Sequence, residues 1–269
     1  MRRNHSSLLL LLFSVYCTAL LTPREFVERH AGGVYTVIPI LENRLLQLPL
    51  HHHRLLSSVQ HLYFDNHSNW LENALEAYPS ASLLHDIRVS SPASSSSSSG
   101  YLTICMGYYD PQSGSAFKPL ISTHFTPREK EALLASWFSD APLKVCTFEY
   151  KRSIPTAKVC SWTTERKFIE ELRESSFAET LLCSRSEVSF SLLEGLTSNV
   201  LVLDGGTLFT ASDTEVLPGS TCHLVLDLCR QMGIPIVRDA PDLRRASSWS
   251  AAFLTSIHDT INNEIVFFD

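Results

Sequence analysis

The stretch LLEGLTSNVLVLDGGTLFTASDTEVLPGST, residues 192–221, combines an acidic residue, a hairpin signal and a helix start in one continuous run. Residues 200–210 read as two apolar strands joined by Gly-Gly, a two-residue connection typical of β-hairpins. LPGST, at 217–221, contains the small and hydroxyl residues that commonly begin a helix. Glu194 stands among leucines. Its carboxylate therefore either faces solvent or is buried opposite a cationic or proton-bearing partner, because an unpaired buried charge is costly.

Short strands and helices alternate on both sides of this stretch. In the second half, residues 179–184, 234–240 and 251–257 are patterned as strands, and residues 165–176 and 221–233 as helices. In the first half, strands are predicted at 34–40, 101–109 and 143–152, and helices at 50–59, 69–78 and 126–138.

This order of elements predicts an α+β fold with two unequal lobes, residues 21–150 and 151–269. The serine tract at 88–100 cannot bury enough apolar surface to order itself, so we interpret it as a surface insertion in the first lobe. Residues 1–20 begin with basic residues and continue as an apolar run. They are interpreted as a targeting or signal segment, with a buried helix as the alternative.

The composition of the chain limits the kinds of molecule that it is expected to bind. Hydrophobic residues make up 44% of the chain and charged residues 19%, which excludes disorder of the whole. The net charge of −6, without a block of basic residues, indicates no general attraction to nucleic acid or to an anionic membrane. The 7 cysteines are scattered without a CxxC pair, so we expect reduced, buried thiols and no metal site. A small molecule or another protein is the expected partner.

Four positions could carry chemistry, and each has an ordinary explanation as well. Glu194 could be exposed, and LPGST could be a helix cap or a phosphate site. Lys158 could be a surface residue, or a buried amine with a lowered pKa that attacks carbonyl carbon. Arg54 could be a surface cation or a phosphate ligand. Taken together they match what pyridoxal 5′-phosphate requires: an amine, a carboxylate at the ring nitrogen, and an arginine with a helix start for the phosphate.

Six motifs also resemble those of one known family, the class IV aminotransferases of fold type IV. Its members include D-amino acid aminotransferase, branched-chain aminotransferase and aminodeoxychorismate lyase, and the sequence looks closest to a plant-type branch described as D-amino-acid-aminotransferase-like. The resemblance runs from about residue 22 to the C-terminus. It is carried by GVYTV (33–37), LHHHRLLSS (50–58), PTAKVCSW (155–162), LLEGLTSNVLVL (192–203), LPGST (217–221) and FLTSI (253–257).

The resemblance implies a role for each matching residue. Lys158 is expected to bond the cofactor covalently, and Glu194 to contact its pyridine nitrogen. The phosphate is expected at Arg54, with Ser220, Thr221 and Ser256 near it. Tyr35 is expected to line the substrate side of the pocket, and Asn199 to belong to the loop after the glutamate.

The sequence also departs from the family pattern. Trp162 stands where an aromatic hydroxyl usually follows the lysine, and Cys222 stands where an arginine is common. Ile257 replaces an expected hydroxyl, Pro39 replaces an arginine of the plant-type relatives, and the chain is expected to lack the family's C-terminal strand and helix.

The predicted function is the transfer of an amino group between an amino acid and a 2-oxo acid. The alternatives are an aminodeoxychorismate-lyase-like reaction, or a non-catalytic protein that keeps the fold. The resemblance further implies a homodimer in the plastid or cytoplasm, while the N-terminal segment leaves a secretory route open.

Overall fold

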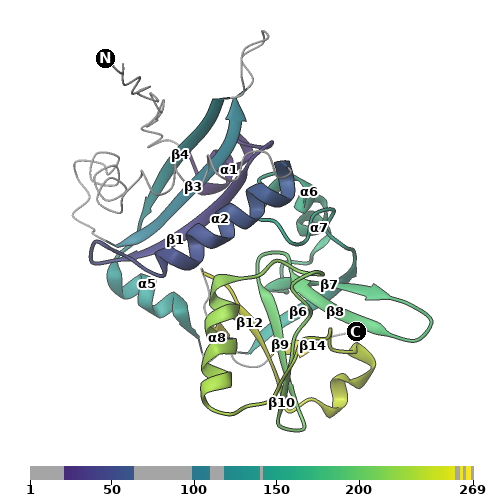
Figure 1. Ribbon diagram of the computed structural model, residues 1–269. Coiled ribbons are helices and arrows are strands. Elements are labelled where there is room, and N and C mark those ends of the chain that lie inside the picture. The colour runs from purple at the N-terminus through teal and green to yellow at the C-terminus, as the bar shows by residue number, and fades with distance from the viewer. Residues whose placement is uncertain are drawn as a thin grey trace, which may run out of the picture.

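The computed structural model describes residues 21–63, 99–109, 118–139, 142–257, 261–262 and 265–267. The predicted targeting segment, the predicted helix at 69–78 and all but the end of the serine tract lie outside these ranges. The described elements form two β-sheets with helices packed on them (Figure 1). This arrangement confirms the predicted α+β class.

The first sheet is antiparallel and has the strand order β2-β1-β3-β4. β1 (Val34–Leu41) turns into β2 (Arg44–Leu45) through Glu42 and Asn43, whose φ values of 49° and 62° suit a two-residue hairpin. β3 (Gly100–Tyr109) and β4 (Lys118–Pro127) complete the sheet.

Helix α2 (Leu48–Tyr63) packs against β1. Its Leu55 and Val59 share a core with Val34 and Ile38 of β1 and Leu102 of β3. This core fixes the orientation of α2, and with it the direction of the polar side chains on the rest of the helix.

The second sheet has ten strands. Eight follow the order β14-β6-β7-β8-β9-β12-β13-β5, while β10 pairs with β9 and β11 pairs with β10. Its strands are β5 (Phe138–Ser139), β6 (Leu143–Glu149), β7 (Glu179–Arg185), β8 (Phe190–Gly195), β9 (Asn199–Asp204), β10 (Thr207–Phe209), β11 (Ile236–Val237), β12 (Ala251–Thr255), β13 (Ile261–Asn262) and β14 (Ile265–Phe267). Two of these strands, β5 and β6, precede residue 150, where the sequence predicts the lobe boundary.

The predicted Gly-Gly hairpin is confirmed. Gly205 and Gly206 join β9 to β10 with φ values of 56° and 79°, a left-handed conformation that glycine adopts without steric cost. Helix α8 (Ser220–Gln231) then packs Cys222 and Leu226 onto Leu201 of β9 and Leu208 of β10.

The remaining helices are short. They are α1 (Pro23–Glu28), α5 (Lys130–Trp137), α6 (Trp162–Glu165), α7 (Lys167–Leu172) and the 3₁₀ helix η2 (Leu243–Ser248). The sequence predicts one helix over 165–176, but α7 ends at Leu172, and residue 173 has an extended backbone. The predicted strand at 234–240 shortens to the two residues of β11.

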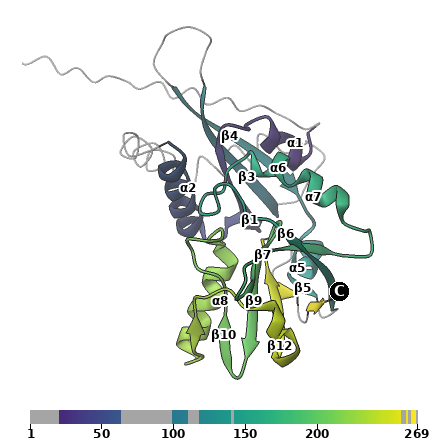
Figure 2. The same cartoon turned by 90° about the vertical axis from the view of Figure 1, so that its right-hand side faces the viewer.

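The two sheets meet where the loop before α6 crosses β1. Tyr35 N donates to Lys158 O at 2.9 Å, and Cys160 N donates to Gly33 O at 2.8 Å. In addition, α2, which packs on the first sheet, contacts α8, which packs on the second (Figure 2). Within the described ranges no helix is both long and apolar enough to span a membrane.

Candidate active site

A pocket lies between the two sheets, with an empty volume of about 760 Å³ including its opening to solvent. Its walls come from β1, α2, the loop before α6, the turn between β8 and β9, and the start of α8. All the predicted site residues line it: Tyr35, Arg54, Lys158, Glu194, Asn199, Ser220, Thr221 and Ser256. The fold therefore brings together residues that are far apart in the sequence, and their roles toward a ligand stay predictions.

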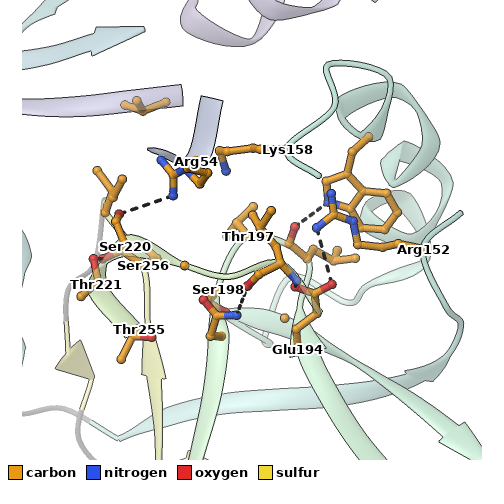
Figure 3. A pocket seen from close by; sticks show the side chains of 18 of the residues that line it. Arg54, Arg152, Lys158, Glu194, Thr197, Ser198, Ser220, Thr221, Thr255 and Ser256 are labelled. Carbon is orange, nitrogen blue, oxygen red and sulfur yellow. Dashed lines mark hydrogen bonds and ion pairs between the residues drawn. The ribbon is translucent and has the colours of Figure 1, made fainter. Parts of the chain in front are cut away.

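Lys158 extends into the pocket between Arg54 and Glu194 (Figure 3). Its backbone N–H donates to Ser58 Oγ at 3.0 Å, which ties the loop to α2, and its Nζ lies 4.7 Å from the centre of the Tyr35 ring. Burial lowers the pKa of this lysine well below its usual value, and the positive charges of Arg54, Arg152 and Arg166 lower it further. The surroundings thus favour a neutral amine, the form that acts as a nucleophile or base.

Glu194 is buried at the end of β8, with only 4% of its surface exposed. Leu217 N donates to its Oε2 at 3.1 Å, and Arg152 Nη1 lies 3.5 Å from its Oε1. Burial raises the pKa of this carboxyl, although Arg152 and the Leu217 N–H act against the rise. A further positive group in the pocket would stabilise the carboxylate, so the site suits a protonated ring nitrogen.

Arg54 reaches the pocket from α2 and is almost wholly buried. It donates to Thr36 Oγ1 and, at 3.4 Å, to Ser220 Oγ, while its Nε has no hydrogen-bond partner in the described part of the chain. Burial lowers its pKa to about 10, so the guanidinium remains charged near neutral pH. A buried cation with an unpaired donor suits an anion such as a phosphate.

His51 supports Arg54 from one turn earlier in α2. Its Nδ1 lies 3.1 Å from Arg54 Nη2 and 2.9 Å from Thr36 Oγ1. Because a guanidinium can only donate, Nδ1 acts as the acceptor, which requires a neutral imidazole. Burial and the charge of Arg54 lower the pKa of His51 to about 2, which agrees with that state.

The start of α8 faces Arg54 across the pocket. Gly219 is the N-cap and makes no side-chain cap hydrogen bond, which leaves the first N–H groups of the helix available to an anion. Thr221 Oγ1 donates to Ser256 O at 3.1 Å and joins α8 to the end of β12. Asn199 Nδ2 donates to Leu217 O at 2.7 Å and holds the loop before the helix.

Several pocket residues were not predicted from the sequence. Arg152 packs its guanidinium 4.7 Å from the centre of the Trp162 ring and donates to Ala157 O at 3.1 Å, beside Lys158. Thr197 and Ser198, in the turn after Glu194, also line the cavity, as does Arg166. No spacing pattern marks these residues, because their position depends on how the loop before α6 folds back onto β8.

The departures from the family pattern occupy different places. Trp162 is buried, and its Nε1 donates to Leu196 O at 2.9 Å, so it braces the turn after Glu194. Cys222 is not among the residues that line the pocket but packs into the core under α8, and burial raises its pKa to about 11. Ile257 does line the pocket. Among the described residues there is no cluster of three potential metal ligands.

A protein-family model matches most of the chain. The model of the family "Amino-transferase class IV" matches residues 33–257. A search of curated proteins finds no significant match to the sequence.

Solved structures share the fold at low sequence identity. A fold IV transaminase from Curtobacterium pusillum has a TM-score of 0.64 at 21% identity and covers 88% of this chain and 79% of its own. A 4-amino-4-deoxychorismate lyase from Pseudomonas aeruginosa has a TM-score of 0.65 at 16% identity, with coverages of 88% and 83%. The PLP-bound form of a hypothetical aminotransferase from Mycobacterium tuberculosis has a TM-score of 0.67 at 15% identity, with coverages of 92% and 85%.

Proposed function

The chain belongs to the class IV aminotransferase family, whose members use pyridoxal 5′-phosphate, and we propose that its pocket binds this cofactor to transfer an amino group between an amino acid and a 2-oxo acid. One observation supports this most directly. A lysine, a carboxylate and an arginine from three separate segments point into one pocket (Figure 3). These are the chemical groups that the cofactor's aldehyde, ring nitrogen and phosphate require, which supports the proposal.

When bound, pyridoxal phosphate supplies an electron sink that stabilises negative charge at the substrate's α-carbon. In this proposal Arg54 and the start of α8 bind the phosphate through charge-assisted hydrogen bonds. Glu194 would accept a hydrogen bond from the ring nitrogen and would keep that nitrogen protonated. Each pKa unit of that preference corresponds to about 1.4 kcal/mol.

Lys158 has two tasks in this proposal. Its amine would hold the cofactor covalently, and its free Nζ would accept the proton from the substrate's α-carbon. Both tasks require a neutral amine, which burial and three neighbouring guanidinium groups favour. Tyr35, whose ring lies beside Nζ, forms the wall on the side where the substrate would enter.

We also propose that the protein forms a homodimer in which the pocket lies near the partner subunit. The resemblance to the family supports this assembly.

The covalent role of Lys158 is tested by colour and reduction. We expect the purified protein to absorb visible light with pyridoxal phosphate bound, and borohydride to fix the cofactor to a peptide containing Lys158. Lys158→Ala should lose the fixed cofactor and the activity together. Lys151→Ala, which changes an exposed lysine of the same loop, should keep both.

A wild-type protein that takes up no cofactor, or a Lys158→Ala protein that stays active, would refute the proposal. An active protein is then offered D- and L-amino acids with pyruvate or 2-oxoglutarate. Formation of the amino acid that corresponds to the added oxo acid indicates a transaminase. In a separate assay with aminodeoxychorismate and no added oxo acid, formation of pyruvate indicates a lyase.

A further inference from the structure

A second buried carboxylate lies just behind the pocket. Glu179, the first residue of β7, is only 8% exposed and does not line the cavity. Its Oε2 accepts hydrogen bonds from Thr197 Oγ1 at 3.0 Å, Ser198 Oγ at 3.2 Å and Thr197 N at 3.3 Å. One carboxylate oxygen therefore holds three donors, all in the turn between β8 and β9.

The other oxygen of Glu179 is engaged outside the turn. Oε1 accepts from Thr180 N at 2.9 Å and lies 3.8 Å from Arg173 Nη1. The side chain is thus anchored on its own strand while its other oxygen faces the turn. This anchoring lets it act as a rigid support.

The supported turn, residues 195–198, is part of the pocket wall. Gly195, Leu196, Thr197 and Ser198 all line the cavity, and Figure 3 shows Thr197 and Ser198 between Glu194 and the start of α8. Glu194 directly precedes this turn and Asn199 directly follows it. The turn therefore connects these two residues, which pair with each other where β8 and β9 meet.

Packing behind the turn leaves no spare space. A Cβ added at Gly195 would lie 2.2 Å from Ser198 Oγ and 3.1 Å from Glu179 Oε2. Leu196 N also donates to Thr180 O of β7 at 3.1 Å, and Trp162 Nε1 donates to Leu196 O at 2.9 Å. The turn is therefore held by both β7 and Trp162 and cannot shift without breaking hydrogen bonds to buried groups.

We propose that Glu179 is a positioning residue for the cofactor site: through Thr197 and Ser198 it holds the turn that directs Glu194 toward the ring nitrogen. The inference rests on the proposed function, because it assumes that the pocket binds pyridoxal phosphate. It assigns a role in cofactor binding to a residue that touches neither the cofactor nor the substrate.

The test measures cofactor affinity and protein stability separately. Both carboxylate oxygens of Glu179 accept hydrogen bonds. In Glu179→Gln one of them becomes an NH₂ group, which would face a hydrogen-bond donor either in the turn or at Thr180 N. We expect the dissociation constant of pyridoxal phosphate, from equilibrium dialysis, to rise about tenfold, as for the loss of a hydrogen bond to a charged group. We also expect the pH midpoint of the bound cofactor's visible absorption to shift, because Glu194 is less well directed. Glu149→Gln, a change at an exposed residue of β6, is the matched control and should change neither.

A double-mutant cycle tests whether the effect passes through the turn. Thr197→Val removes one donor to Glu179, so Glu179→Gln combined with Thr197→Val should weaken binding clearly less than the product of the two single effects. Independent effects, or a folded Glu179→Gln protein with wild-type affinity and absorption midpoint, would overturn the proposal.

Two variants keep the test decisive if Glu179→Gln does not fold. Gly195→Ala keeps Glu179 but displaces the turn, because the added methyl group meets Ser198 Oγ and the Glu179 carboxylate. Thr197→Val removes one hydrogen bond to Glu179. If both bind the cofactor as the wild type does, the turn does not direct Glu194 and the inference is wrong. A wild-type protein that binds no cofactor would instead refute the proposed function itself, and this inference with it.

Discussion

At the scale of single residues, the site consists of charges that are buried with incomplete partners. Arg54 Nε has no hydrogen-bond partner among the residues that the structure describes, the pKa of Glu194 is raised, and the pKa of Lys158 is lowered. Each condition is unfavourable in the protein alone and becomes favourable when a ligand supplies the missing charge. The cofactor proposed here supplies a phosphate, a ring nitrogen and a carbonyl carbon at the corresponding places.

Arg54→Gln should weaken binding of pyridoxal phosphate by roughly ten- to a hundredfold, because it removes hydrogen bonds from a charged donor to the phosphate. Pyridoxal, which lacks the phosphate, serves as the control ligand, and its dissociation constant should change by less than about twofold. An equal loss of affinity for both ligands would show that Arg54 maintains the shape of the pocket and does not bind the phosphate.

The pH dependence of stability should reveal the neutral state of His51. Its pKa falls from an ordinary 6.5 to about 2 in the folded protein, so below pH 6.5 the unfolded chain binds a proton that the folded protein does not. Stability contributed by this group is therefore complete above about pH 6.5 and decreases as the pH falls, by at most ~1.4 kcal/mol per pH unit.

Urea unfolding at several pH values between 4 and 8 measures this slope. His51→Gln should flatten it below pH 6.5, whereas His223→Gln, which changes an exposed residue of α8, should leave it unchanged. An identical slope in the His51 variant would contradict the assignment of a neutral, buried imidazole.

At the scale of elements, the proposed phosphate site depends on how closely α8 approaches β9. A Cβ at Gly219 would lie 1.9 Å from Asn199 Oδ1, so the N-cap of α8 and the first residue of β9 meet without room for a side chain. The glycine permits this contact, and Asn199 in turn holds the LPGST loop through Leu217 O. The position of the LPGST motif therefore depends on its contacts with Asn199, the first residue of β9.

Gly219→Ala should destabilise the protein by roughly 1–3 kcal/mol, the usual effect of inserting a methyl group into a packed site. It should also weaken pyridoxal phosphate binding, because α8 moves away from Arg54. Gly32→Ala, where an added Cβ meets nothing within 4 Å, is the control. If Gly219→Ala changes neither the stability in denaturant nor the affinity for the cofactor, then Asn199 and α8 can move apart at no cost and the prediction is wrong.

At the scale of the whole molecule, the pocket exists only because two sheets come together. Arg54 belongs to the helix that covers the first sheet, whereas Glu194 belongs to the second sheet and Ser220 to helix α8, which packs on that sheet. Main-chain hydrogen bonds between β1 and the Lys158 loop fix the two halves relative to each other. A ligand that contacts both halves would therefore stabilise their association.

The proposed homodimer is a prediction at this scale. Light scattering during gel filtration should give about twice the chain mass of 30.2 kDa for the cofactor-bound protein. A particle of the single-chain mass that is nevertheless active would contradict the proposed assembly.

Much of the fold and of the candidate site could be predicted from local sequence. The Gly-Gly hairpin and the start of α8 follow from turn chemistry and apolar patterning, which act over a few residues. The residues around Glu194 left its burial open, and the structure decided it. The grouping of Lys158, Glu194 and Arg54 also came from residue chemistry and from the family resemblance. Helix ends were less predictable, as α7 shows, because its last residues lack the packing that would extend it.

Only the tertiary structure decided what surrounds those residues. Arg152 meets Glu194 and Trp162, and Glu179 meets Thr197, because loops and strands distant in the sequence fold against one another. Likewise, Cys222 stands in the family motif yet packs into the core beneath α8. Sequence determined which chemical groups this protein carries and much of their local conformation. Their partners, burial and pKa values were set by long-range packing, which no short stretch of sequence encodes.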